Sequence, residues 1–363
     1  MKRKGISLFV AVLILTSLVS CRKSETNRIK ENVFAFDTYI TFTVSEGPKS
    51  RAGLDAAIRR IHEIEQRMSA TLPESDVSKV NQNAGKQPVQ VHPDTFFVIK
   101  TALDYAKLTN GGFDISMLPI SRLWDLSGDN PYIPDQEEIL QTLALVDYRK
   151  IKLDEEKNTV YLESEAMAVD LGGIAKGYAG DEVVRILKEH GVAHALINLG
   201  GNIMVINERE DGSAWRIGIQ NPRQEEDAGN VGAVAVVQAQ DCAVVTSGDY
   251  ERYNVQVLEQ TGQRYHHIFD PETGYPAKKG IISVTIVTEN GIDADALSTS
   301  LFVLGVQDAL KLANSLEGID AMMITEDKEI YFSDGFREQV SEIHSDYRVV
   351  EDMETPVPED EPE

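Results

Sequence analysis

The segment at residues 170–181 constrains the fold of this chain most. It follows a short apolar stretch and contains an acid, two glycines and the start of a predicted helix. The segment reads Asp-Leu-Gly-Gly-Ile-Ala-Lys-Gly-Tyr-Ala-Gly-Asp. A Gly-Gly turn between a strand and a helix lets the backbone approach a phosphate, and the helix N-terminus favours the negative charge. The same turn also occurs as a plain connection, so the stretch alone leaves a phosphate site and a connection equally open.

The N-terminus has the layout of a lipoprotein signal peptide. Lys2, Arg3 and Lys4 precede an apolar run over residues 6–19, which is too short to span a bilayer comfortably. The run ends in Leu-Val-Ser before Cys21, which resembles a bacterial lipobox, in which the cysteine is acylated. We expect residues 1–20 to be removed and the exported protein to be lipid-anchored to a bacterial membrane through Cys21, facing the periplasm or extracytoplasmic side. An ordinary signal with a chance cysteine is the less favoured alternative.

Charge and cysteine content limit the partners and the covalent links. The formal net charge of −24 argues against nucleic acid, because its phosphates would be repelled. The chain has two cysteines, Cys21 and Cys242, so lipid on Cys21 leaves no intrachain disulfide. Residues 21–31 are predicted to be a tether, residues 32–340 the folded domain, and residues 341–363 an acidic, disordered tail.

Hydrophobic periodicity predicts many strands and fewer helices. Helices are expected at residues 54–68, 93–108, 136–145, 174–190, 294–304 and 306–316. Strands are expected at residues 36–44, 151–153, 159–162, 195–199, 203–206, 215–219, 232–237, 243–246, 264–269, 282–288, 321–324 and 330–332. Residues 73–85 are predicted to be loop, and residues 113–130 an irregular segment of the kind that carries binding groups. This order indicates an α+β fold with mixed or antiparallel sheets and flanking helices.

A second polar segment, residues 293–299, lies where a strand is predicted to give way to a helix. Asp295 and Thr299 are four positions apart and share a helix face, so their oxygens are suited to Mg²⁺. The alternative is helix capping, in which Asp293 or Asp295 accepts hydrogen bonds from first-turn amides. Without further context, capping is favoured.

A third segment, residues 264–276, is a predicted strand that runs into a turn rich in proline and glycine. Side chains alternate along a strand, so at most one of His266 and His267 faces a given site. A histidine near its working pKa acts as a general base, although a lone strand histidine is more often structural. A fourth cluster holds Ser247 and Gly248, but no base lies next to Ser247, which argues against a serine nucleophile.

Together these segments resemble the ApbE family of FAD:protein FMN transferases over about residues 32–336. The segments that carry the resemblance are residues 113–124, 170–177, 198–202, 246–250, 267–274 and 295–299, which occur in the order of the family. The resemblance implies a T-fold-like domain that binds FAD and Mg²⁺. It also implies transfer of FMN to a threonine or serine of a target protein in a membrane redox complex, with release of AMP.

The family also implies roles for individual residues. Asp170 and Lys176 would lie at the FAD site, and His267 would be the base that deprotonates the acceptor hydroxyl. The carbonyl of Gly173 and the side chains of Asp295 and Thr299 would hold Mg²⁺. The remaining residues implied at the FAD site are Phe36, Thr71, Met117, Leu118, Pro119, Ser247, Gly248 and Ile268 or Phe269.

Thr71 departs from the family, because many members carry tyrosine at this position. An aromatic ring there would stack on the flavin or the adenine. Its absence leaves two further hypotheses open. The same site could hydrolyse FAD to FMN and AMP, or the chain could be a lipoprotein that binds flavin without chemistry.

Overall fold

The computed structural model of the chain describes residues 27–126, 132–223 and 232–351. The predicted signal peptide, Cys21 and residues 352–363 of the predicted tail lie outside these ranges. Among the described residues, no helix has the length and apolar character needed to cross a bilayer.

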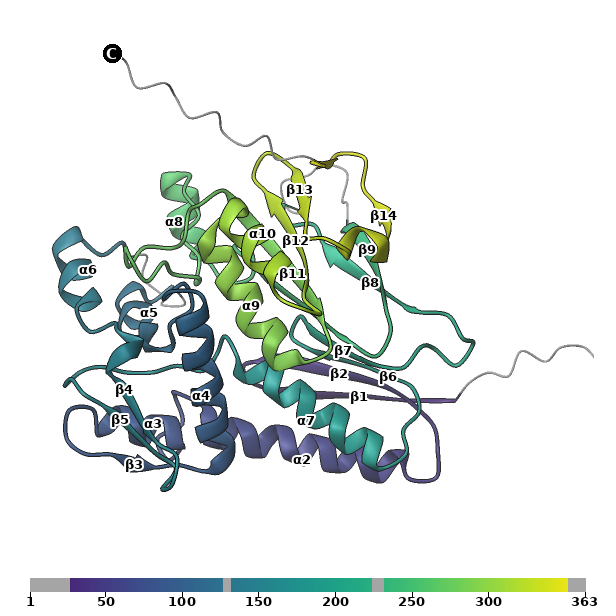
Figure 1. The fold of residues 1–363 in the computed structure, drawn as a ribbon, viewed down its shortest axis with the longest axis horizontal. Helices are drawn as coiled ribbons and strands as arrows, with labels where there is room; N and C mark the ends of the chain where they lie inside the picture. The colour runs from purple at the N-terminus through teal and green to yellow at the C-terminus, as the bar shows by residue number, and fades with distance from the viewer. Residues whose placement is uncertain (1–26, 127–131, 224–231, 352–363) are drawn as a thin grey trace, which may run out of the picture.

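The described residues form a large central sheet with helices on one face and a smaller sheet on the other (Figure 1). The order of its strands is β1-β2-β6-β7-β10-β11-β12-β13-β15. Paired neighbours are antiparallel except β13 and β15, which confirms the α+β class. The strands are β1 (Arg28–Ala35), β2 (Thr38–Ser45), β6 (Ala195–Leu199), β7 (Asn202–Ile206), β10 (Ala243–Gly248), β11 (Ile281–Thr288), β12 (Asp320–Thr325), β13 (Glu329–Phe332) and β15 (Arg348–Val349).

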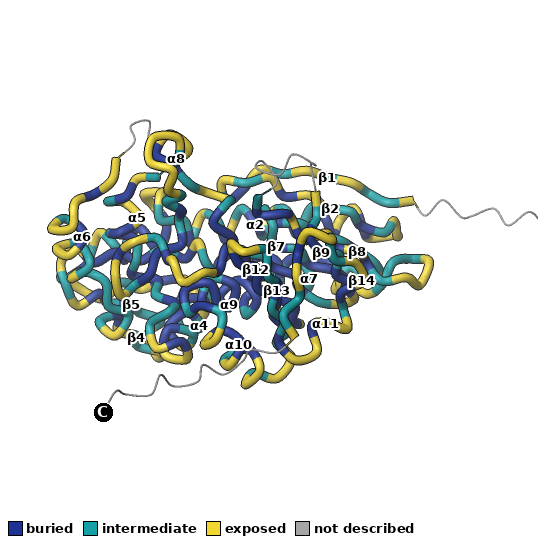
Figure 2. The backbone as a smooth tube through the Cα atoms, turned by 90° about the horizontal axis from the view of Figure 1, so that it is seen from above, coloured by how far each residue is buried: buried dark blue, intermediate teal, exposed yellow. Residues whose placement is uncertain are grey.

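Four helices cover one face of the central sheet and form the main core with it. They are α2 (Ser50–Met68), α7 (Ala175–Glu189), α9 (Gly291–Leu304) and α10 (Val306–Ser315). The alternation in β2 places Ile40, Phe42 and Val44 in this core. Figure 2 shows the buried backbone concentrated through α9 and the strands behind it, whereas α6 (Gln136–Leu143) and α8 (Val255–Thr261) are largely exposed at one end.

The opposite face of the central sheet packs on a second sheet, whose strand order is β14-β9-β8. These strands are β8 (Trp215–Gln220), β9 (Ala233–Ala239) and β14 (Val340–Ile343), with α11 (Phe336–Gln339) beside them. Strand β11 is buried along its whole length because it is covered on both faces.

A smaller group of elements lies beside the N-terminal helix layer (Figure 1). Its members are α3 (Asp76–Gln82), β3 (Val89–Gln90), α4 (Pro93–Leu108), α5 (Leu118–Trp124), α6 (Gln136–Leu143), β4 (Ile151–Asp154), β5 (Thr159–Leu162) and the 3₁₀ turns Ile115–Met117 and Tyr148–Lys150. Trp124 is buried at the end of α5, and its indole N–H donates to the Gly274 carbonyl at 2.9 Å. This bond ties the group to the turn after His267.

The structure corrects several predicted boundaries. The alternating run at residues 36–44 is interrupted, because Phe36 and Asp37 adopt positive φ and form the turn between β1 and β2. Strand β1 begins inside the predicted tether, since its pairing with β2 extends to Arg28. Strand β15 and all of β14 after Val340 lie inside the predicted tail, so secondary structure continues to Val349.

Two segments between residues 73 and 269 also differ from expectation. Residues 73–85 contain helix α3, which the Ser75 side chain caps by accepting from the Ser78 amide. Residues 264–269 form only isolated bridges at His266 and Phe269 rather than a strand, and helix α8 (Val255–Thr261) precedes them. Isolated bridges and single backbone hydrogen bonds, such as that from the Ala277 amide to the Ile268 carbonyl at 2.8 Å, therefore position this part of the chain in place of a continuous ladder.

Candidate active site

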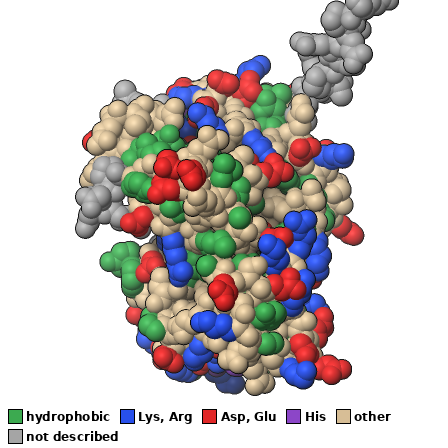
Figure 3. All heavy atoms as spheres, turned by 90° about the vertical axis from the view of Figure 1, so that its left-hand side faces the viewer, with side chains coloured by type: hydrophobic (Ala, Val, Ile, Leu, Met, Phe, Trp, Pro, Cys, Tyr) green, Lys and Arg blue, Asp and Glu red, His purple; other side chains and the backbone are tan. Residues whose placement is uncertain are grey.

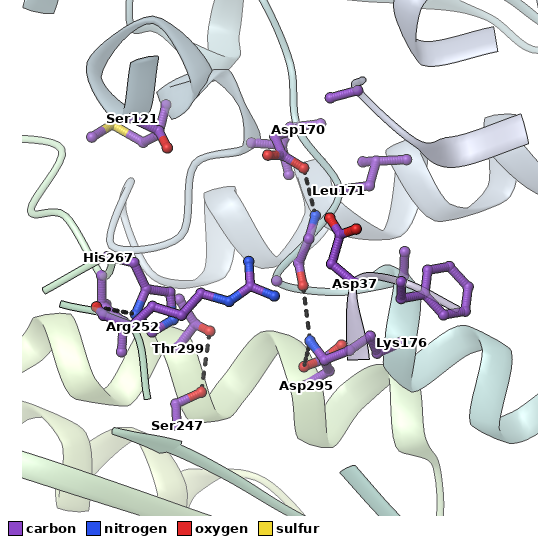
Figure 4. A pocket seen from close by; sticks show the side chains of 18 of the residues that line it. Asp37, Ser121, Asp170, Leu171, Lys176, Ser247, Arg252, His267, Asp295 and Thr299 are labelled. Atoms are coloured by element: carbon purple, nitrogen blue, oxygen red, sulfur yellow. Dashed lines mark hydrogen bonds and ion pairs between the residues drawn. The ribbon is translucent and has the colours of Figure 1, made fainter. Parts of the chain in front are cut away.

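A cavity of about 950 Å³ opens where the β1–β2 turn, the ends of α2 and α7, helix α9 and the segment after β10 meet (Figure 4). Its volume suits a nucleotide-sized ligand. It brings together most of the residues that the sequence singled out. The lining includes Phe36, Thr71, Met117, Leu118, Asp170, Gly173, Lys176, Ser247, His267, Ile268, Phe269, Asp295 and Thr299.

Two residues predicted at the FAD site are not part of the lining. Pro119 lies in the first turn of α5, where its missing N–H costs no helical hydrogen bond. Gly248 is buried at the end of β10, and a Cβ there would lie 2.2 Å from Cε1 of Tyr250. Gly248 therefore makes room for Tyr250, which does line the cavity.

The close crossing of α7 and α9 places Lys176 beside Asp295. A Cβ on Gly177 would lie 2.2 Å from the Gly291 carbonyl oxygen, so the crossing requires glycine. The Gly177 amide donates to Asp295 Oδ2 at 2.9 Å, and Asp295 is only 3% exposed. Lys176 Nζ lies 3.7 Å from Asp295 Oδ1 and donates to the Gly172 carbonyl at 3.1 Å.

The first turn of α9 is capped by a residue of α7 and not by its own acids. Asp181 accepts from the amides of Gly291 at 2.6 Å and Ile292 at 2.9 Å. Burial raises the pKa of Asp181 to about 6. Asp293 instead accepts from the Tyr105 hydroxyl at 2.6 Å. Capping therefore does not account for Asp295, whose carboxylate faces the cavity.

The oxygens near Asp295 form a donor set that fits Mg²⁺. Thr299 follows Asp295 by one helical turn, and its Oγ1 lies 3.4 Å from Ser247 Oγ. A Cβ on Gly173 would lie 3.7 Å from Thr299 Oγ1, so the Gly172-Gly173 turn runs close to this hydroxyl. One carboxylate, one hydroxyl and a nearby carbonyl are hard oxygen ligands. The described residues contain no cluster of three or more His, Cys, Asp or Glu side chains that would hold a metal.

The two histidines point to different environments. His266 is 5% exposed, and its Nε2 lies 3.0 Å from the Ala277 carbonyl, a structural contact. His267 lines the cavity, and its Nδ1 lies 3.3 Å from the Arg252 carbonyl. Surrounding protein lowers the pKa of His267 to about 3, with burial as the main cause. Of the two histidines, His267 lines the cavity and His266 does not, although residues 264–269 do not form the strand on which the expectation of at most one was based.

Glu251 and Arg252 are among the charged residues of this cavity that were not predicted from the sequence. The surrounding cavity walls desolvate the Glu251 carboxyl and raise its pKa to about 7, although the residue keeps contact with solvent and the charges of Lys176 and Arg252 lower this pKa. Both residues follow the polar segment 246–250 directly, and that adjacency was the available signal.

A buried ion pair holds the chain just before Glu251 and Arg252. Both guanidinium nitrogens of Arg223 donate to the Asp249 carboxylate at 2.8 Å, and the side chains are 13% and 7% exposed. Asn221, close by in sequence, accepts from the Tyr347 hydroxyl at 2.7 Å. The second sheet thus anchors the segment that carries Glu251 and Arg252.

The β1–β2 turn brings a further acid to the cavity. The Phe36 amide donates to Glu65 Oε1 at 2.6 Å, which stabilises a left-handed conformation with φ values of 53° and 56° at Phe36 and Asp37. Asp37 lies on the same side of the cavity as Asp170 and Lys176 (Figure 4).

The fold and this mixed-charge cavity define an α+β protein with a site of nucleotide size. The sequence profile of the ApbE family matches residues 36–323, and the chain belongs to that family. The chain is 32% identical over 348 residues to an FAD:protein FMN transferase of Treponema pallidum, with 91% of this chain and 94% of the relative covered. The ApbE protein of Thermotoga maritima, a solved structure, superposes with a TM-score of 0.78 at 32% identity, covering 87% of this chain and all of the other. The flavin transferase ApbE of Vibrio cholerae gives a TM-score of 0.77 at 27% identity, covering 86% of this chain and 99% of the other.

Proposed function

We propose that this protein transfers FMN from FAD to a threonine or serine hydroxyl of a target protein, releases AMP and requires Mg²⁺. The observation that carries the proposal is the convergence of His267, Lys176, Asp295 and Thr299 on one cavity. The name of the Treponema pallidum relative, FAD:protein FMN transferase, describes the same reaction.

The reaction needs a base and positive charge. The acceptor oxygen attacks the phosphorus of the FMN half of FAD, and the bond from that phosphorus to the AMP oxygen breaks. The hydroxyl proton passes to the base, and AMP leaves with its phosphate. Negative charge builds on the phosphate oxygens, so nearby cations and N–H donors lower the barrier.

His267 fits the role of the base. The Arg252 carbonyl can only accept, so the proton of the neutral imidazole is assigned to Nδ1, which donates to it. This tautomer leaves the lone pair of Nε2 available for the acceptor proton. Burial lowers the pKa of His267 to about 3, so the ring is neutral at neutral pH but is a weaker base than an ordinary histidine, and the assignment rests on its position and tautomer.

The α7–α9 side of the cavity supplies the charge stabilisation. Asp295, Thr299 and the Gly173 carbonyl would hold Mg²⁺, which would neutralise charge on the phosphate oxygens when bound. The Gly177 amide holds the Asp295 carboxylate in place by a hydrogen bond of 2.9 Å. Lys176 extends from the first turn of α7, so its ammonium reaches the same side of the cavity.

Thr71 supports hydrolysis as a second candidate on the same site. It is exposed and lines the cavity, and its hydroxyl lies 2.9 Å from Ser69 Oγ. A threonine offers no ring to stack on the flavin or the adenine, so water has more room near the phosphorus. Hydrolysis would release FMN and AMP without a covalent product.

The proposed lipid on Cys21 would hold the site at a membrane surface on the periplasmic or extracytoplasmic side. An acceptor in a membrane redox complex would then meet the cavity at that surface. The face in Figure 3 carries interspersed acidic and basic side chains with apolar ones between them, so no single charge dominates it.

The test incubates the protein with FAD, Mg²⁺ and a threonine-containing acceptor peptide. We expect AMP release and flavin that stays on the peptide through denaturing gel electrophoresis, and both signals should disappear with a chelator. His267→Gly should lower transfer about 100-fold while FAD binding persists. His92→Gly, on the exposed N-cap of α4, is the control. Flavin binding without AMP release would contradict both transfer and hydrolysis, and would favour the hypothesis of a lipoprotein that binds flavin without chemistry.

A further inference from the structure

A guanidinium group in the cavity has no role in the reaction described so far. The Arg252 side chain extends across the cavity toward the side that carries Asp37, Asp170 and Lys176 (Figure 4). Arg252 is exposed, and within residues 27–126, 132–223 and 232–351 its guanidinium makes no hydrogen bond or ion pair. An arginine held in a concave site without a partner is suited to an anionic ligand.

The backbone of Arg252 is held in place from two directions. Its carbonyl accepts from the His267 amide at 3.1 Å, and the next residue, Tyr253, forms a bridge with His266. The Arg264 guanidinium lies 4.2 Å from the centre of the Tyr253 ring. On the other side, the Asp249 pair with Arg223 fixes the segment. Arg252 is therefore set at a fixed place beside the predicted base.

Acidic side chains outnumber basic ones among the described residues that line the cavity. The lining contains several carboxylates: Asp37, Glu65, Asp114, Asp170, Glu251 and Asp295. Among the lining residues that the structure describes, Lys176 and Arg252 are the two that are lysine or arginine. Lys176 already contacts the Gly172 carbonyl and lies near Asp295. The Arg252 guanidinium makes no hydrogen bond or ion pair within the described residues, and a ligand with phosphates needs such a charge in a cavity this acidic.

We propose that Arg252 binds the pyrophosphate of FAD and makes the site select a flavin dinucleotide over flavin without phosphate. The planar guanidinium can donate two parallel hydrogen bonds to phosphate oxygens, which an ammonium group cannot do. The inference rests on the proposed function, because it names the group that recognises the donor. It assigns Arg252 to binding and leaves the proton to His267.

Equilibrium binding of FAD and of riboflavin to the full chain, with Mg²⁺ present, tests this role. Arg252→Gln should weaken FAD binding about tenfold or more and leave riboflavin binding unchanged. Arg252→Lys should fall between the two, because it keeps the charge and loses the paired geometry. Arg51→Gln, an exposed arginine at the opposite end of α2 from the cavity, is the control and should change neither affinity.

The outcomes separate this inference from the proposed function. If the wild-type chain binds FAD more tightly than riboflavin and Arg252→Gln removes the difference, the inference holds even where no AMP is released. If Arg252→Gln loses equal affinity for FAD and for riboflavin, Arg252 supports the shape of the cavity, and the inference is overturned. Unchanged FAD affinity would overturn it too, including the case in which only transfer to the acceptor falls, because Arg252 would then serve the acceptor. A wild-type chain that binds no flavin would overturn both.

Discussion

The cavity has two walls that are built in different ways. The helix wall, formed by α7 and α9, holds Lys176, Asp295 and Thr299 on regular backbone that packs through Gly177. The loop wall, residues 249–269, holds its charged groups on irregular backbone tied down by side chains and isolated bridges. Helix geometry fixes the first wall locally, whereas the second depends on contacts from distant parts of the chain.

The largest expected effect comes from the helix wall. Asp295→Ala removes the buried carboxylate of the proposed Mg²⁺ site, so AMP release from FAD should fall about 1,000-fold. Asp308→Ala, an exposed acid in the first turn of α10, is the matched control. If Asp295→Ala still releases AMP and needs the same Mg²⁺ concentration as the wild type, Asp295 is not a ligand of the metal.

Breaking the anchor of the loop wall should cost stability as well as activity. Asp249→Asn replaces the carboxylate that pairs with the buried Arg223 side chain by a neutral amide, which should lower the free energy of unfolding by about 3 kcal/mol. Chemical denaturation measures this change, and Asp55→Asn in the exposed pair with Arg51 is the control. If the two variants lose the same stability, the Arg223–Asp249 pair is not the anchor described above.

A methyl group at the helix crossing should have a somewhat smaller effect. Gly177→Ala places a Cβ 2.2 Å from the Gly291 carbonyl oxygen, so the free energy of unfolding should fall by about 2 kcal/mol. At Gly232 a Cβ meets nothing within 4 Å, and Gly232→Ala should leave stability nearly unchanged. Equal denaturation midpoints for the two variants would show that α7 and α9 separate easily.

The smallest effect is a pH dependence in the loop wall. The pKa of Glu251 is raised from 4.5 to about 7, so the folded protein holds this proton more tightly than the unfolded chain. Ionisation of Glu251 therefore costs folding stability as the pH rises from 4.5 to 7. Glu251→Gln should gain stability relative to the wild type across this window and level off above it. Glu74→Gln, with a side chain that is 93% exposed, should show no such trend in denaturation midpoints at pH 4.5 and 7.5.

The same contrast explains what sequence could predict. The spacing of Asp295 and Thr299 on a helix is a local pattern, and the structure keeps it. Arg252 was missed because its place depends on the pairing of Arg223 with Asp249, which the local pattern does not encode. The expected strand at residues 264–269 was wrong for a related reason, since isolated bridges and the bond from Trp124 to Gly274 hold that segment. Helix α3 was missed because its polar composition resembles a loop, although Ser75 supplies a good cap.

The ratio of AMP released to flavin bound covalently tests the central claim most directly. The full chain is mixed with FAD, Mg²⁺ and a threonine-containing acceptor peptide, and both products are counted over time. If both walls act in one transfer reaction, the two amounts stay equal in the wild type and fall together in His267→Gly. AMP that accumulates without covalent flavin would contradict transfer and assign the site to hydrolysis.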